Sequence, residues 1–156
     1  MSGVEKPNNI RAVLQQTLKP LKSKIAIATS GGIDSASLVM AAKDLDKKQT
    51  IVSFTFDDFE SHDFKSARLL AMHYNIDFLP VLLPSDQNEI VETVHYLIKE
   101  IKCKKKSAIE CMFPFVYLLK VLKKKKIDTL VTGLAADGHF GLSKKAMIHY
   151  SKDDKK

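Results

Sequence analysis

The feature that most constrains the fold is a short apolar run that ends in a glycine-rich turn. Residues 24–29 read Lys-Ile-Ala-Ile-Ala-Thr, which is typical of a buried strand, and Gly31 and Gly32 follow directly. A helix is expected from Asp34 to Leu45, because the small side chains at its start would let it pack closely on a sheet. The segment therefore predicts a strand, a tight turn and a helix in immediate succession.

Strands and helices continue to alternate along the chain. Runs rich in apolar and β-branched residues predict further strands, at 50–56, 77–82 and 127–132. Apolar residues at helical spacing predict further helices, at 8–19, 64–74, 86–101 and about 109–124. Pro114 is expected either in the first turn of the last helix or at a kink within it.

This alternation predicts the α/β class, with a doubly wound, mainly parallel sheet flanked by helices in a Rossmann-like arrangement. Pro80 favours an edge position for the strand at 77–82, because proline has no amide hydrogen to donate to a neighbouring strand. Ligands of such sheets bind beyond the carboxyl ends of the strands. The loops at 30–35 and 133–141 both follow strands, so we expect them to face one cleft.

Length and composition limit the possibilities further. The 156 residues suit one domain, expected at 1–150 and followed by a Lys-rich tail at 151–156. No apolar run approaches the roughly 20 residues of a spanning helix, and no membrane partner is expected. The first residues lack the pattern of a secretory signal, so a cytoplasmic location is expected. Cys103 and Cys111 form no CxxC pair and are expected to be free thiols.

Positive charge is concentrated in runs of lysine. The formal net charge is +7, and lysines gather within 102–106, at 123–126 and after Tyr150. Such runs could bind nucleic acid or phosphates. They are also typical of solvated helix ends, where lysines favour the negative carboxyl end of the helix dipole. The second interpretation is favoured, because no aromatic residues alternate with these lysines.

The turn at residues 30–35, Ser-Gly-Gly-Ile-Asp-Ser, has the chemistry of a phosphate-binding loop. Gly31 and Gly32 permit close approach of a phosphate to backbone amides at the positive end of the helix. Ser30 and Ser35 can add hydroxyl donors. Asp34 beside an anion is explained if it holds Mg²⁺ that bridges the phosphates. Otherwise the segment is merely a turn, and Asp34 a favourable acid in the first turn of a helix.

The hexapeptide resembles the SGGxDS pyrophosphate-binding loop of the PP-loop ATP pyrophosphatases. That resemblance implies an enzyme that cleaves ATP between its α and β phosphates and transfers AMP to an oxygen of its substrate. Pyrophosphate is released into the loop, and ammonia, a thiol or an amine then displaces the AMP.

Two more segments are similar to the synthetase domain of asparagine synthetases. The Ser-Phe of residues 53 and 54 leads to Ser-His-Asp-Phe-Lys at 61–65, and Leu-Val-Thr-Gly-Leu-Ala-Ala-Asp-Gly-His-Phe-Gly occupies 130–141. The resemblance implies Asp34 and Asp137 as catalytic ligands of one Mg²⁺ ion. It also implies that adenine and ribose are held largely by backbone groups, those of Ala28, Phe56, Thr132 and Gly133.

The sequence departs from this family pattern at two positions. Leu134 stands where the family has a glutamate, and Gly138 where it has an acidic residue, so neither can handle protons. His139 could substitute as a titratable group. Because Ser2 rather than a nucleophilic cysteine follows Met1, no glutaminase domain is expected, and ammonia would come free or from a separate glutaminase. Lys144, Lys145 or Lys152 could reach the phosphates.

Three hypotheses follow. The first is an ATP-dependent ligase that adenylylates a carboxylate, with aspartate favoured, and forms an amide from ammonia. The second is a PP-loop enzyme that modifies tRNA and uses the positive charge for the phosphate backbone. The third is an ATP-binding module that has lost turnover, which Leu134 and Gly138 favour.

Overall fold

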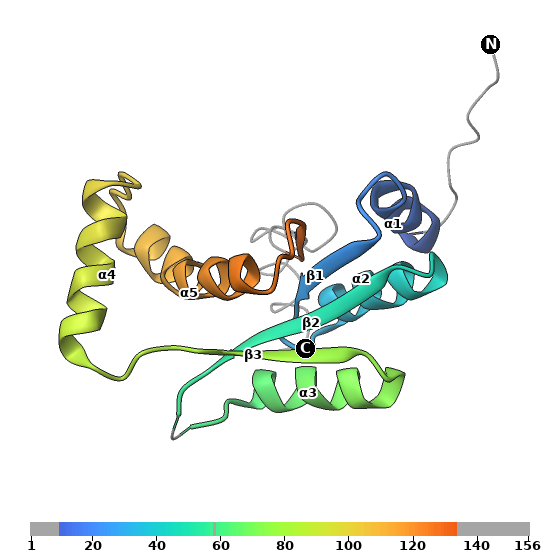
Figure 1. Ribbon diagram of the computed structural model, residues 1–156, viewed down its shortest axis with the longest axis horizontal. Helices are drawn as coiled ribbons and strands as arrows, with labels where there is room; N and C mark the ends of the chain where they lie inside the picture. The colour runs from blue at the N-terminus through green and yellow to red at the C-terminus, as the bar shows by residue number, and fades with distance from the viewer. Residues whose placement is uncertain (1–9, 58, 134–156) are drawn as a thin grey trace, which may run out of the picture.

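The computed structural model describes residues 10–57 and 59–133, and the strands among them form one parallel sheet (Figure 1). Its four strands, in the spatial order β3-β2-β1-β4, are β1 (Lys24–Ala28), β2 (Lys48–Thr55), β3 (Asp77–Leu82) and β4 (Leu130–Thr132). Five helices accompany the sheet: α1 (Ile10–Leu18), α2 (Ile33–Asp44), α3 (His62–Tyr74), α4 (Gln87–Lys99) and α5 (Lys106–Lys124). The predicted α/β class and its parallel sheet are confirmed.

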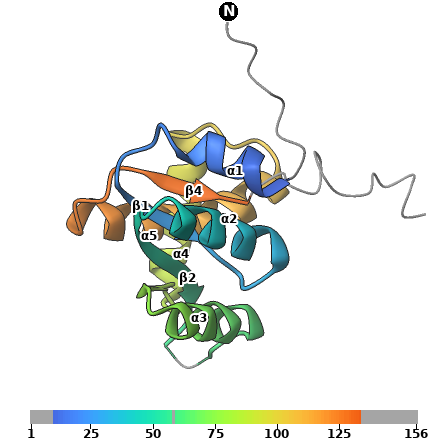
Figure 2. The same cartoon turned by 90° about the vertical axis from the view of Figure 1, so that its right-hand side faces the viewer.

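The chain reverses its direction across the sheet after β3. It moves outward from β1 to β2 and β3, then returns to place β4 on the other side of β1, so that β4, β1 and β2 follow one another in Figure 2. The switch point therefore lies between β1 and β4, which is where ligands of such sheets bind. Pro80 lies on β3, at an edge of the sheet as predicted.

Alternation along β1 distributes its side chains to two cores. Ile25 and Ile27 are fully buried in one cluster with side chains of α1, α2 and α3. Ala26 lies in the other cluster, which is formed mainly with α5. Successive residues of a strand point to opposite faces of the sheet. The two clusters therefore lie on opposite faces, and helices cover both of them.

The last strand begins later than the sequence predicted, at Leu130 rather than Ile127. Lys126 adopts a left-handed conformation, with φ of 53°, directly after α5. The amide of Ile127 donates to the carbonyl of Leu122 at 3.0 Å, and the Ile127 side chain is buried under the helix. This is the geometry of a helix carboxyl-terminal cap. Ile127 therefore belongs to the cap that follows α5, and not to the strand.

Capping also decides where α3 begins. The Ser61 hydroxyl accepts a hydrogen bond from the amide of Phe64 at 3.1 Å, which starts the helix at His62, two residues before the predicted Phe64. Asp63 is therefore in the first turn of α3 rather than in a loop. Pro114 lies inside α5, since that helix begins earlier than predicted, at Lys106.

Several lysines serve the structure itself. The Lys24 ammonium donates to the carbonyl of Lys125 at 3.2 Å, and the Lys47 ammonium donates to the carbonyls of Lys19 and Leu21. Lys123 and Lys124 lie in the last turn of α5, as the interpretation of solvated helix ends requires. Binding of nucleic acid by the lysine runs stays a prediction.

A buried hydrogen bond joins α4 to α5, between the hydroxyls of Thr93 and Tyr117 at 2.7 Å. Burial raises the pKa of Tyr117 above its usual value. Replacing Tyr117 with phenylalanine leaves the Thr93 hydroxyl without this partner, so the free energy of unfolding should fall by about 1–3 kcal/mol. The stability that the neutral tyrosine provides is present below about pH 10 and is lost as the pH rises further.

Urea unfolding of the Tyr117→Phe variant at pH 7 and pH 10.5 measures both effects. The variant should lose less stability than the wild-type chain between the two pH values. Tyr96→Phe is the control, because Tyr96 lies on the same helix as Thr93 and is 46% exposed. Equal losses of stability between the two pH values in the wild-type chain and in Tyr117→Phe would contradict the role of neutral Tyr117.

None of the described helices is both long and apolar enough to cross a membrane. The end of the predicted domain at residue 150 and the tail at 151–156 lie outside the described residues.

Candidate functional site

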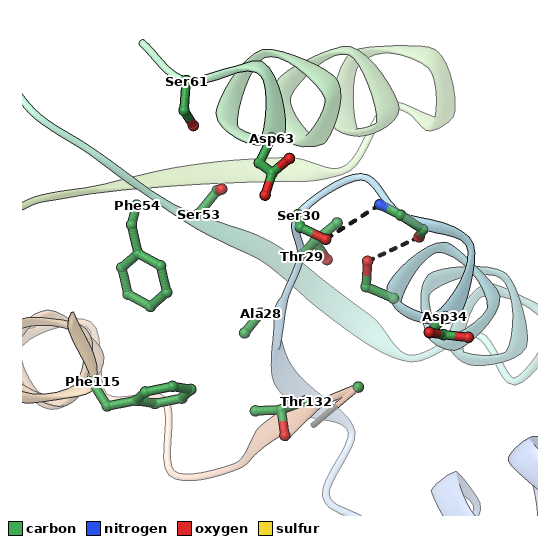
Figure 3. Close-up of a pocket in the computed structure, with 13 residues that line it drawn as sticks. Ala28, Thr29, Ser30, Asp34, Ser53, Phe54, Ser61, Asp63, Phe115 and Thr132 are labelled. Atoms are coloured by element: carbon green, nitrogen blue, oxygen red, sulfur yellow. Dashed lines mark hydrogen bonds between the residues drawn. The ribbon is translucent and has the colours of Figure 1, made fainter. Parts of the chain in front are cut away.

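A hollow of about 390 Å³ lies at the carboxyl ends of the strands, at the switch point between β1 and β4 (Figure 3). Segments far apart in the sequence meet here: the end of β1, the start of α2, β2, the start of α3, α5 and the end of β4. The lining residues are Ala28, Thr29, Ser30, Gly32, Asp34, Ser35, Ser53, Phe54, Ser61, Asp63, Phe115, Thr132 and Gly133.

The turn after β1 is folded tightly upon itself. The amide of Gly32 donates to the Ser30 hydroxyl at 3.3 Å, and the Ser35 hydroxyl donates to the carbonyl of Gly32 at 3.1 Å. Before the turn, the amide of Thr29 donates to the carbonyl of Val52 at 2.9 Å and continues the sheet pairing by one residue. The turn is therefore anchored at both ends, which preorganises it for a ligand.

Gly31 is required by its conformation and by its neighbour. Its φ of +79° is disfavoured for other residues, and a Cβ atom at this position would lie 2.4 Å from the Cβ of Ser66 on α3. The sequence prediction gave Gly31 a role in the approach of phosphate. The structure adds that α3 packs directly against the turn and fixes its position.

The amino terminus of α2 is open toward a ligand. Gly32 is its N-cap residue, and no side chain caps the helix. The first amides of a helix have no partner within it, and the helix dipole is positive there, so an anion is favoured. The adjoining Ser30 hydroxyl accepts from Gly32 and has its own hydrogen to donate, whereas the Ser35 hydroxyl already donates to the Gly32 carbonyl.

Asp34 lies in the first turn of α2, exposed and at the wall of the hollow. The end of β4 adjoins it, since a Cβ atom on Gly133 would lie 3.6 Å from the Cβ of Asp34. Asp137 would follow four residues later but lies outside the described residues, as do Leu134, Gly138 and His139. A magnesium ion shared by Asp34 and Asp137 therefore stays a prediction.

Phe56, predicted at the adenine and ribose, lies elsewhere. Strand β2 ends at Thr55, and the Thr55 hydroxyl and the Phe56 amide both donate to the carbonyl of Phe59, which turns the chain away. Phe56 is 41% exposed and lines a separate hollow beside Arg68. Phe54 faces the site instead, with its ring edge-on to that of Phe115 at 5.9 Å between centroids.

The other predicted binding residues come together, except Gly31, which does not line the hollow and faces Ser66 of α3. Ala28, Ser30, Gly32, Ser35, Thr132 and Gly133 all line the hollow with Asp34. Six further lining residues were given no binding role from the sequence: Thr29, Ser53, Phe54, Ser61, Asp63 and Phe115. The Ser-x-Asp pattern at 61–63 could have indicated two of them, since a serine cap places the following acid in the first turn of a helix. No local signal indicated Phe115, which arrives from the middle of α5.

Asp63, in the first turn of α3, gives the hollow a second carboxylate. In Figure 3 its carboxylate points toward Ser53 and Ser30. Carboxylate and hydroxyl oxygens are the ligand type that Mg²⁺ prefers, and one or two carboxylates usually suffice when phosphates complete the shell. Among residues 10–57 and 59–133 no group of three acidic, histidine or cysteine side chains could hold a metal alone. The site thus suits a magnesium ion that arrives with a phosphate ligand.

The comparisons with known proteins can be set beside this geometry. Residues 9–152 match the family model described as asparagine synthase. No curated protein matches the chain.

The solved structures that are similar to the chain include the following two. One is an NH3-dependent NAD synthetase from Campylobacter jejuni, with 14% identity, a TM-score of 0.49 and coverage of 78% of this chain and 51% of that one. The other is described as a predicted subunit of tRNA methyltransferase from Methanocaldococcus jannaschii, with 17% identity, a TM-score of 0.49 and coverage of 85% and 64%. The chain therefore spans about half to two thirds of these proteins.

Proposed function

Because the chain belongs to the asparagine synthase family, we propose that it binds ATP in the hollow at the switch point and adenylylates a carboxylate substrate. The observation that carries this proposal is the uncapped start of α2 beside the Ser-Gly-Gly turn. Backbone amides and the Ser30 hydroxyl there offer donors to an anion of several oxygens. The β and γ phosphates of ATP are that anion, and pyrophosphate remains there after cleavage.

The nucleoside would lie across the rest of the hollow. Ala28 and Thr132 belong to adjacent strands, β1 and β4, and Phe54 and Phe115 lie on another side of the same space. Backbone groups at the ends of the two strands can bind the adenine edge, and the aromatic rings give it an apolar contact. Phe54 takes the place that the sequence gave to Phe56.

The proposed reaction has two steps. A carboxylate oxygen of the substrate attacks the α phosphorus, and the bond to the β-phosphate oxygen breaks, so that pyrophosphate leaves with the electron pair. Ammonia then attacks the acyl carbon, AMP leaves, and the amide forms as a proton is lost. Preorganised donors at the loop stabilise the charge that develops on pyrophosphate.

Magnesium would be held by Asp34, with Asp137 as the second protein ligand. When bound, the ion would supply positive charge against the phosphates. This role matters here because no arginine or lysine is among the described residues that line the hollow. The chain's own contribution is to hold the carboxylates beside the start of α2.

Aspartate is the acceptor that the resemblance favours, and exchange of labelled pyrophosphate into ATP tests it. Label should enter ATP only when a carboxylate acceptor is present, and aspartate is the first acceptor to test. Ser30→Ala removes a hydroxyl from the wall of the hollow and should slow exchange about tenfold. Ser37→Ala is the matched control, because the Ser37 hydroxyl, on the adjoining helix α2, donates to the carbonyl of Ile33 and Ser37 does not line that hollow.

Other outcomes select other functions. Exchange that requires tRNA would favour a tRNA-modifying enzyme. ATP binding without exchange in the presence of any acid or tRNA would leave the module that has lost turnover, which Leu134 and Gly138 favour. Absence of ATP binding would refute all three.

A further inference from the structure

A second hollow lies between α4 and α5. Figure 1 shows α4 beyond the carboxyl ends of β2 and β3. Its volume of about 620 Å³ exceeds that of the first hollow and is within the range of small-molecule sites, roughly 300–1,000 Å³. Most of its wall is apolar: Leu97, Ile101, Met112, Phe115, Val116 and Leu119.

The two hollows meet at one side chain. Phe115 lines both of them, and its ring lies against that of Phe54, which lines only the first among the hollows described. The ring of Phe115 is therefore the wall that the two hollows share.

The second hollow leaves several large apolar side chains in contact with water. Leu119 is 54% exposed, Ile101 46% and Met112 39%. Charged groups are confined to Glu92, Lys120 and Lys123, and the Lys120 ammonium lies over the ring of Tyr117, 5.0 Å from its centroid. Such a site favours a ligand with an apolar body, because burying the apolar wall against it releases water.

We propose that the hollow between α4 and α5 binds the hydrocarbon part of the carboxylate substrate, and that this substrate is an apolar alkyl acid rather than aspartate. The inference rests on the proposed function, since the acid must reach the α phosphate of ATP in the first hollow. Aspartate would place its ammonium group and second carboxylate against leucine, methionine and phenylalanine side chains, at a cost in desolvation. An alkyl chain carries no such groups.

The test uses stable mimics of the acyl adenylate, in which a sulfamoyl group joins an acyl chain to adenosine. Calorimetry compares AMP with the acetyl, butyryl, hexanoyl and aspartyl compounds on the whole chain. Each methylene that leaves water contributes about fourfold in affinity. The hexanoyl compound should therefore bind at least tenfold more tightly than the acetyl compound, and the aspartyl compound no more tightly than the acetyl.

Two leucine variants locate the effect. Leu119→Glu places a charge in the second hollow and should abolish the gain from acetyl to hexanoyl while the affinity for AMP stays unchanged. Leu69→Glu is the matched control, because Leu69 is a 63% exposed leucine on α3 that lines neither hollow. It should keep the full gain.

The outcomes separate this inference from the proposed function. AMP binding with no dependence on chain length, or with tightest binding of the aspartyl compound, would overturn the inference alone. A dependence on chain length that survives Leu119→Glu would also overturn it, because the chain would then lie elsewhere. Failure of AMP and of every mimic to bind would refute the proposed function and the inference with it.

Discussion

Replacing Gly31 with alanine should lower the free energy of unfolding by about 2–5 kcal/mol, combining the cost of a left-handed conformation with that of overpacking. The φ of +79° is unfavourable for alanine, and the new Cβ atom would lie 2.4 Å from the Cβ of Ser66 and 3.0 Å from its carbonyl carbon. The nearest atoms thus include backbone, which cannot rotate away. The turn and α3 must separate, so ATP binding should be lost as well.

Urea unfolding and calorimetry with ATP measure the two effects. Gly32→Ala is the control, because the nearest atom to its Cβ would be the Ser30 hydroxyl oxygen at 3.3 Å and its φ of −71° suits alanine. It should change stability by less than about 1 kcal/mol. Adding Ser66→Gly to Gly31→Ala removes the closest contact and should restore part of the lost stability. No restoration would show that packing against Ser66 is not the cause.

Asp34→Ala should abolish the magnesium dependence of ATP binding. In the presence of Mg²⁺ the affinity should fall by about 10–150-fold, the range expected for loss of an interaction with a charged group. Without Mg²⁺ the variant should bind ATP slightly better than the wild-type chain, because a carboxylate beside the phosphates has gone. Calorimetric titration of ATP with and without Mg²⁺ measures both changes in affinity.

The change in ATP affinity in the presence of Mg²⁺ distinguishes a metal ligand from an acid that merely favours the start of a helix, because the two roles predict changes of opposite sign. In the second case the variant loses about 0.3–1 kcal/mol of stability and binds ATP better under both conditions. Asp128→Ala is the control, since Asp128 lies before the amino end of β4, whereas the hollow lies at the carboxyl end, and it pairs with Lys22 on the surface. It should leave ATP binding unchanged. An unchanged affinity of Asp34→Ala in Mg²⁺ would exclude Asp34 as a ligand.

Local sequence patterns predicted the helices and strands well where each element depends only on residues within its own segment. The apolar run of β1, the glycine turn and the start of α2 could all be recognised, because strand, turn and helix each depend on neighbouring residues. The ends were less well predicted at α3 and β4. Ser61 sets the start of α3, and Lys126 delays the start of β4, through capping geometry. The periodicity of apolar residues in the sequence does not indicate such caps.

By itself the sequence determined the parallel α/β fold, the loop at the end of β1 and most of the residues around it. These follow from hydrophobic alternation and from the conformations that glycine permits, which are local properties. Tertiary structure alone decided that Phe54 rather than Phe56 faces the site, that Asp63 and Phe115 join it, and that Ser66 requires Gly31. The physical reason is that these contacts join segments tens of residues apart, so their geometry is set by packing across the sheet.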